Sequence, residues 1–165
     1  MKTTLLALLA AVLPALAQQP PPPLSEDMVK NVILTWYQGT NDHHPVEELL
    51  VLLDDNVEMR YPNRPEPFTG KEAFKAWYAD VLAKYFDETH HVEACEITTD
   101  GNSASANVVV RWERRSWEPG AAKSLYAASL SRQHFEFARD PATGRVTIRK
   151  KIVETFEPTA PIFGN

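Results

Sequence analysis

The stretch TGKEAFKAWYADVLAKYFDETHHVEACEIT, from Thr69 to Thr98, decides the fold of this 165-residue chain, because its hydrophobic period changes along its length. In its first part, apolar side chains recur at the spacing of a helix face: Phe74, Trp77, Tyr78, Val81 and Leu82. Thr69 and Glu72 match a capping box, which starts a helix. From Thr89 the pattern alternates between apolar and polar, as on a half-buried strand. The stretch therefore predicts a helix followed by a long strand.

Three more strand patterns follow this one and are separated by turn sequences. They cover residues 104–117, 124–137 and 145–156. Asp100-Gly101-Asn102 is typical of a tight hairpin turn, and residues 140–144 contain the Pro and Gly of a longer turn. With the strand at residues 89–98, these patterns predict an antiparallel meander of four long strands.

Two helices and a short strand are predicted before the opening stretch. Ser25, followed by two acidic residues, indicates an N-cap, and this first helix ends near Gly39-Thr40-Asn41, where a glycine is expected. Pro45 opens the second helix. Its buried face is predicted to be Leu49, Leu50, Leu52 and Leu53. Residues 57–61 are expected to form a short strand. Helices followed by a meander indicate one α+β domain over residues 24–158, with a tail at 159–165.

The first residues have the layout of a secretory signal peptide. Lys2 precedes an apolar run at Leu5–Leu13 that is too short to span a bilayer, and Ala15-Leu16-Ala17 matches a cleavage site. We expect cleavage after Ala17 and secretion of the mature protein; a buried N-terminal helix is the alternative. Gln18–Pro23 is expected to be an extended, proline-rich linker.

Composition excludes several classes of partner. The net charge is −5, and only Arg149-Lys150-Lys151 forms a basic run, which argues against nucleic acid binding. No later segment has the length and apolarity of a membrane span.

Four of the five histidines are the adjacent pairs His43-His44 and His90-His91. Adjacent strand residues point to opposite faces, so no metal site is predicted. The single cysteine, Cys95, cannot form an internal disulfide and is expected to be a buried, unreactive thiol.

Several local sequences resemble those of the SnoaL-like family within the nuclear-transport-factor-2-like superfamily. They are LLVLLDDNVEMRYP at residues 49–62, FTGKEAF at 68–74, Thr89-His90-His91-Val92 and Gly144-Arg145-Val146. The resemblance covers residues 24–158. It implies three N-terminal helices packed in the concave face of a strongly curved, mainly antiparallel sheet. Such a cone has an open, mostly apolar cavity, which suits a small organic ligand.

Ketosteroid isomerase is one chemistry known on this fold, and it suggests two positions in this chain. The carboxylate base of that enzyme falls where this chain has Arg60 and Tyr61. The acid of its oxyanion hole falls near Gln133, whose amide can still donate a hydrogen bond. The missing carboxylate argues against the isomerase reaction.

Scytalone dehydratase suggests a second set of residues. The resemblance places its strand tyrosine at Tyr61, the histidine of its Thr-x-His motif at His91 and its acidic residue at Asp42. Asn41 and Arg114 stand where that enzyme has a tyrosine and a second histidine. The dehydratase set is therefore incomplete in this chain.

We expect Tyr61 and His91 to act as a proton-transfer pair, since histidine exchanges protons near neutral pH and a phenol can polarise a substrate oxygen. A structural role for His91 is the alternative, because alternation places it on one face with Glu93, Cys95 and Ile97. Aromatic side chains and one amide are expected to line the cavity: Trp36, Tyr37, Trp77, Trp112 and Gln133.

Two classes of function remain open from the sequence. One is a cofactor-independent isomerase, cyclase or dehydratase that acts on a small polyketide-, terpenoid- or steroid-like molecule; no phosphate loop or dinucleotide motif indicates a cofactor. The other is a non-catalytic module that binds a small ligand or forms a homodimer through the outer face of its sheet.

Overall fold

The computed structural model describes residues 22–140 and 143–159. The predicted signal peptide and most of the proline-rich linker lie outside these ranges, as does the C-terminal tail after Thr159. Within the described residues, three helices and seven strands form one unit. The α+β class, the three helices, the short first strand and the four long strands were predicted from the sequence, whereas the two-residue strands β2 and β7 were not. None of these helices is long and apolar enough to cross a membrane.

The first two helices begin where the sequence predicted. Helix α1 spans Glu26–Asn41, and the Ser25 hydroxyl caps it by accepting the backbone N–H of Met28 at 3.3 Å. Helix α2 spans Val46–Leu50 and follows Pro45. Gly39 lies inside α1 and does not end it. A Cβ at Gly39 would come within 2.6 Å of Leu49 Cδ2, so this glycine allows α2 to pack closely against α1.

The predicted capping box at the third helix is wrong. Helix α3 spans Lys71–Lys84, and its N-cap is Gly70, which has no side chain to accept a hydrogen bond. Gly70 has a φ of +88°, a conformation that glycine adopts without steric cost. Thr69 instead belongs to a short strand, β2 (Phe68–Thr69), that the sequence analysis did not predict.

The four long strands of the meander are confirmed. They are β3 (Tyr85–Asp100), β4 (Ser103–Ser116), β5 (Leu125–Arg139) and β6 (Val146–Val153). The first strand, β1 (Leu53–Arg60), starts earlier than expected. Leu53 is therefore not part of the α2 face, because it pairs with Ile148 of β6. The strand order is β2-β1-β6-β5-β4-β3, and the short β7 (Glu157–Pro158) pairs with β5. Among the strands of the described residues, only β1 and β6 pair in parallel.

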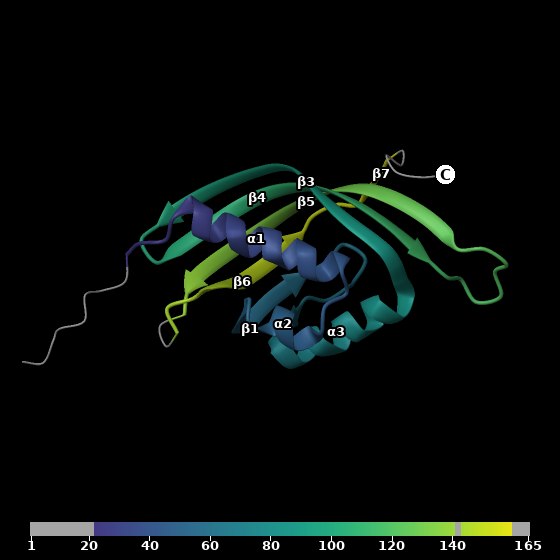
Figure 1. Cartoon of the computed structure of the whole chain (residues 1–165), viewed down its shortest axis with the longest axis horizontal. Helices are drawn as coiled ribbons and strands as arrows, with labels where there is room; N and C mark the ends of the chain where they lie inside the picture. Colours follow the sequence, from purple (N-terminus) through teal and green to yellow (C-terminus); the bar gives the residue numbers. More distant parts are fainter. Residues whose placement is uncertain (1–21, 141–142, 160–165) are drawn as a thin grey trace, which may run out of the picture.

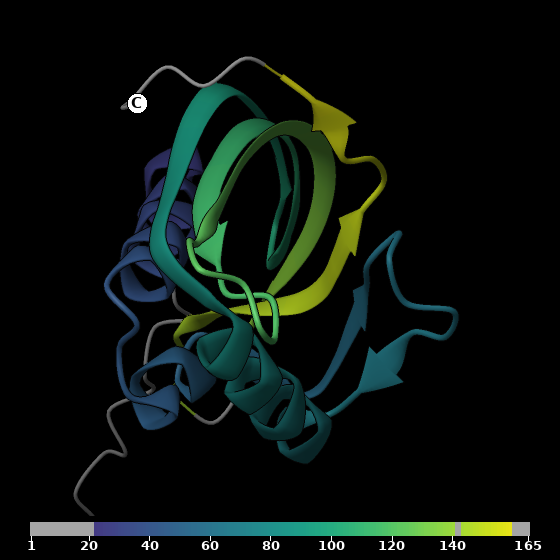
Figure 2. The same cartoon turned by 90° about the vertical axis from the view of Figure 1, so that its right-hand side faces the viewer.

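The sheet is strongly curved and carries the helices on its concave side. Figure 1 shows α1 running across the long strands, and Figure 2 shows the strands bent into an arch with α3 at one end. Helix α1 packs against β3 and β6, and α3 packs against β1. The core between them is formed by fully buried side chains, among them Ile33, Trp36, Phe74, Phe135 and Ile148. One end of this core is hollow, and the candidate site lies there.

Candidate functional site

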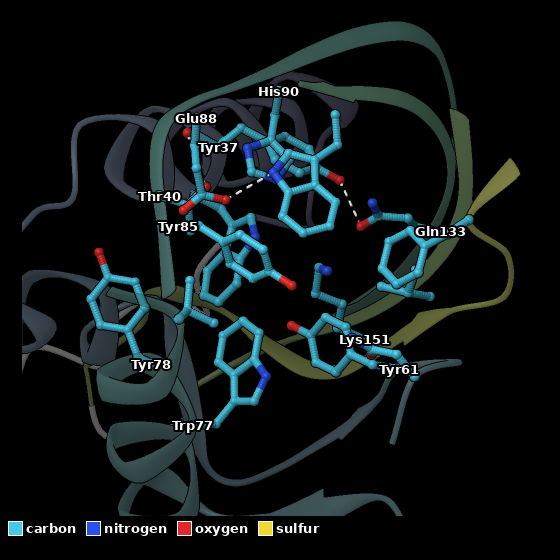
Figure 3. Close-up of a pocket in the computed structure, with 16 residues that line it drawn as sticks. Tyr37, Thr40, Tyr61, Trp77, Tyr78, Tyr85, Glu88, His90, Gln133 and Lys151 are labelled. Atoms are coloured by element: carbon cyan, nitrogen blue, oxygen red, sulfur yellow. Dashed lines mark hydrogen bonds between the residues drawn. The ribbon is translucent and has the colours of Figure 1, made fainter. Parts of the chain in front are cut away.

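A pocket with aromatic walls opens between the helices and the curved sheet (Figure 3). The space open to the centre of a water molecule is about 100 Å³. One water needs about 10–15 Å³ in this measure, so the pocket has room for a small organic molecule. Each of the long strands and both longer helices contribute side chains to its wall.

All the side chains expected to line the cavity do line this pocket. They are Trp36, Tyr37, Trp77, Trp112 and Gln133, and Tyr61 joins them. Tyr37 Oη donates a hydrogen bond to Gln133 Oε1 at 2.9 Å. Tyr61 is buried, which raises the pKa of its phenol, and it stacks on Trp77 with ring centroids 4.7 Å apart. Arg60, the other residue that stands where ketosteroid isomerase has its carboxylate base, is exposed and does not line the pocket.

The histidine in the pocket wall is His90 and not the predicted His91. His90 pairs with Trp112 across β3 and β4, whereas His91 pairs with Arg111 and faces the other side of the sheet. The structure therefore does not bring His91 and Tyr61 together around the pocket.

The predicted grouping of His91 with Cys95 and Ile97 on one face is also wrong. The β3–β4 register shifts between Val92 and Ala94, and Glu93 is the additional residue of a β-bulge. This bulge inverts the alternation, so Cys95 and Ile97 share the core face with Val92. Cys95 is partly buried there, and burial raises the pKa of its thiol, in agreement with an unreactive role.

His90 is held as a neutral imidazole. Its ring stacks between Tyr37 and Trp112, with centroids 5.3 and 5.8 Å away. Asn41 Oδ1 accepts both the His90 backbone N–H, at 2.8 Å, and Nδ1–H, at 2.7 Å. An amide oxygen only accepts, so the proton is on Nδ1 and the lone pair is on Nε2. Burial, and secondly the cationic charge of Lys151, lowers the pKa of His90 to about 3.

Asp42, which the resemblance to scytalone dehydratase suggested as an acidic site residue, lies outside the pocket. It contacts Gln38 and lies 3.7 Å from His44 Nε2 on the surface. Asn41 lies beside His90, at the position where a carboxylate would stabilise a protonated imidazolium. The amide of Asn41 carries no charge that could do so. Arg114 Cζ lies 3.7 Å from the centroid of the Trp112 ring, where it makes a cation–π contact.

A buried carboxylate, Glu88, marks one side of the pocket. Its Oε1 accepts Trp112 Nε1–H at 2.8 Å, and its Oε2 lies 2.9 Å from His43 Nε2. Burial raises the pKa of Glu88, and the hydrogen bond with His43 partly opposes this effect. Both carboxylate oxygens are therefore occupied, which suits a role in orienting Trp112.

Lys151 is a site residue that the sequence analysis missed, as it also missed Glu88 and Tyr85. Its side chain lines the pocket and is 4% exposed. Nζ lies 4.8 Å from the ring centroid of Tyr61, 5.5 Å from that of Phe135 and 5.9 Å from that of Trp36. Within residues 22–140 and 143–159, no carboxylate forms an ion pair with it. Burial lowers the pKa of its amine to about 7.

A bulge explains why the sequence pattern gave no signal for Lys151. In the β5–β6 register, Phe137 faces Ile148 but Glu136 faces Lys150, so Arg149 is an additional residue on β6. Uninterrupted alternation from Ile148 would have directed Lys150 inward. The bulge directs Lys151 inward in its place and leaves Lys150 near Glu136.

The described residues offer no set of side chains that could bind a metal ion. Among the described residues, no three His, Cys, Asp or Glu side chains lie close enough together to hold a metal ion. The polar groups of the pocket are instead a buried amine, phenols, amides, the Thr40 hydroxyl, one neutral imidazole and the single carboxylate of Glu88.

Comparisons with known proteins agree with this architecture. The sequence model of the SnoaL-like domain family matches residues 33–149. No curated protein matches the chain. A candidate scytalone dehydratase from Novosphingobium aromaticivorans has a similar structure, with 17% identity, a TM-score of 0.69, and coverage of 81% of this chain and 85% of that one.

Two further solved structures are similar at low identity. A hexachlorocyclohexane dehydrochlorinase has 14% identity and a TM-score of 0.68, covering 84% of this chain and 91% of its own. A ketosteroid isomerase-like protein from Erwinia carotovora atroseptica has 16% identity and a TM-score of 0.62, covering 84% of this chain and all of its own, 100%. At these identities the likeness shows the fold alone.

Proposed function

This chain belongs to the SnoaL-like domain family, and we propose that it is a cofactor-independent acid–base enzyme, an isomerase or a lyase. Its substrate is a small, mainly apolar molecule that carries a carbonyl or hydroxyl oxygen. The observation that carries this proposal is the Lys151 amine, buried in an aromatic pocket without an ion-pair partner among the described residues.

The pocket wall supports the proposed class of substrate. Its surface is mostly aromatic, so it favours apolar carbon skeletons by burying them. Its polar atoms are few and come from neutral groups, apart from Lys151 and Glu88. A highly charged substrate would be left without partners in such a site, whereas a single oxygen can receive a hydrogen bond.

Lys151 has the properties of a general base. A base works best when its pKa lies close to the operating pH, and burial places the pKa of this amine at about 7. A neutral amine can then take a proton from carbon next to a carbonyl group. The Tyr61 phenol stays protonated because burial raises its pKa, so it can donate a hydrogen bond to the substrate oxygen.

His90 is proposed as a hydrogen-bonding group and not as the base. With a pKa of about 3 its imidazole is neutral at physiological pH and a weak proton acceptor. We therefore assign the role of general base to Lys151. This assignment replaces the proton-transfer pair of Tyr61 and His91 that was expected from the sequence. The isomerase and dehydratase names of similar structures are consistent with proton transfer of this kind.

A non-catalytic binding function is the second candidate. It is favoured by Asn41, which stands beside His90 where a carboxylate would make the imidazole a stronger base. The same pocket would then hold a small apolar molecule and return it unchanged.

Exchange of ketone α-protons separates the two candidates. Cyclohexanone in D₂O, followed by proton NMR, should lose its α-proton signal faster with the wild type than in buffer. Lys151→Met should lower this rate by about 10²-fold or more, the usual contribution of a general base. Lys150→Met is the matched control, because its amine lies on the other face near Glu58 and Glu136.

Two outcomes of the cyclohexanone experiment would contradict parts of the proposal. Full exchange activity in Lys151→Met would remove the base from the proposal. Binding of cyclohexanone, seen as broadening of its signals, with no exchange above buffer in the wild type would favour the binding module.

A further inference from the structure

We infer that Lys151 is a nucleophile as well as a base, and that it forms a covalent imine with the carbonyl carbon of a small apolar aldehyde or ketone. The inference rests on the proposed function for its pocket and its class of ligand. It adds a covalent intermediate, which proton transfer alone does not require.

The surroundings of the amine favour its nucleophilic form. Only an uncharged amine has the lone pair that attacks a carbonyl group. Nζ of Lys151 lies among the rings of Trp36, Tyr61 and Phe135, and no carboxylate in the described ranges forms an ion pair with it. A pKa of about 7 agrees with this geometry.

The neighbouring lysine shows the contrast. Lys150 Nζ lies 3.8 Å from a carboxylate oxygen of Glu58 and 3.8 Å from one of Glu136. Two carboxylates favour the charged ammonium, which cannot attack a carbonyl carbon. The two consecutive lysines therefore occupy opposite chemical environments on the two faces of one strand.

The pocket also contains the groups that imine formation needs. Figure 3 shows the Lys151 amine and the hydroxyls of Tyr61 and Tyr85 pointing into the same part of the cavity. The buried phenol of Tyr61 makes only a weak contact, at 3.8 Å, with Met59 Sδ, so its O–H can turn to a substrate oxygen. An apolar wall surrounds the carbon skeleton of the ligand.

The covalent step balances without an oxidant or reductant. The Nζ lone pair forms a bond to the carbonyl carbon, and the C=O π electrons move to oxygen, which takes a proton. The nitrogen carries two protons after the attack and releases one of them to give the neutral carbinolamine. The carbinolamine hydroxyl then takes a second proton and leaves as water, while the nitrogen releases its remaining proton and forms the C=N bond. The net change is amine plus carbonyl to imine plus water. Protonated on nitrogen, the imine withdraws electrons from the adjacent C–H bond and makes it more acidic.

Reductive trapping tests this inference. The full-length protein is incubated with benzaldehyde and sodium cyanoborohydride, which delivers hydride to the protonated imine and leaves a stable benzylamine. Intact mass and peptide mapping then locate the label. At pH 7 an ordinary lysine is almost entirely protonated, so Lys151 should be labelled at least about tenfold faster than Lys150. Lys150→Met should keep this fast labelling, and Lys151→Met should lose it. Labelling spread evenly over the lysines of the wild type would overturn the inference.

The two proposals fail separately. Benzaldehyde has no α-proton, so its trapping reports imine formation independently of proton exchange. Catalysed exchange of cyclohexanone with no selective trapping would refute the imine and leave the acid–base enzyme standing. Selective trapping without exchange would support the nucleophile and refute the proposed catalysis. If Lys151→Met does not fold, competition supplies the evidence: cyclohexanone should slow benzaldehyde labelling of wild-type Lys151, and a lack of competition would count against a shared pocket.

Discussion

Replacement of Lys151 by methionine should change how stability depends on pH. Burial lowers the pKa of this amine from 10.5 to about 7, so the unfolded chain binds a proton that the folded protein has released between those two values. The free energy of unfolding of the wild type therefore rises with pH across this window, by up to about 1.4 kcal/mol per pH unit. The total is on the order of 5 kcal/mol. Below pH 7 the whole cost of burying the amine is present, and above pH 10.5 it has disappeared.

Lys151→Met has no amine to titrate and fills a similar volume with an apolar chain. It should be more stable than the wild type at pH 7, by an amount that shrinks steadily towards pH 10. Urea unfolding at each pH unit from 7 to 10 gives the two curves. Lys150→Met should follow the wild-type slope, because its side chain is about 30% exposed beside two carboxylates. Parallel curves for the wild type and Lys151→Met would refute a buried amine with a lowered pKa.

Two further substitutions test the packing and the electrostatics of the site. Gly39→Ala should lower the free energy of unfolding by about 1 kcal/mol in urea, since a Cβ 2.6 Å from Leu49 Cδ2 overpacks the contact by more than the gain in helix propensity. In a Leu49→Ala background the same change should cost nothing, and a stabilising effect in the wild type would contradict the close contact. Asn41→Asp should raise the pKa of His90 from about 3 by about one unit or more, because a carboxylate would face Nδ1. NMR titration of the ring nitrogens measures this, and an unchanged value would mean that burial alone sets the pKa.

Much of the architecture was predictable from local sequence. Helix and strand periods, the Ser25 cap and the hairpin turn at residues 100–102 are encoded by residues close together in the chain, so they can be read without the tertiary structure. The pocket aromatics followed from the resemblance and from their periodic positions. Trp77, for example, is on the predicted apolar side of α3. The export signal stays a prediction, as does the dimer.

The cap of α3 was not predictable in the same way. Thr69-Gly70-Lys71-Glu72 matches a capping box by residue type, but β1 pairs with Thr69 and draws it into a strand. Gly70 then takes the N-cap position in a left-handed conformation. A contact between segments distant in sequence therefore overrode a local preference.

The sequence by itself determined the order of the three helices, the first strand and the four long strands, the α+β class and the family, because each of these depends on periodicity and local motifs. The tertiary structure decided which member of two adjacent pairs enters the pocket: His90 and not His91, Lys151 and not Lys150. The physical reason is the same on both strands. A single additional residue, Glu93 on β3 and Arg149 on β6, puts the alternation of the residues before it out of phase with that of the residues after it. Whether a strand accommodates such a bulge depends on its partner strand and on the curvature of the whole sheet. Local sequence patterns contain no information on either of these, so the bulges could not be predicted from them.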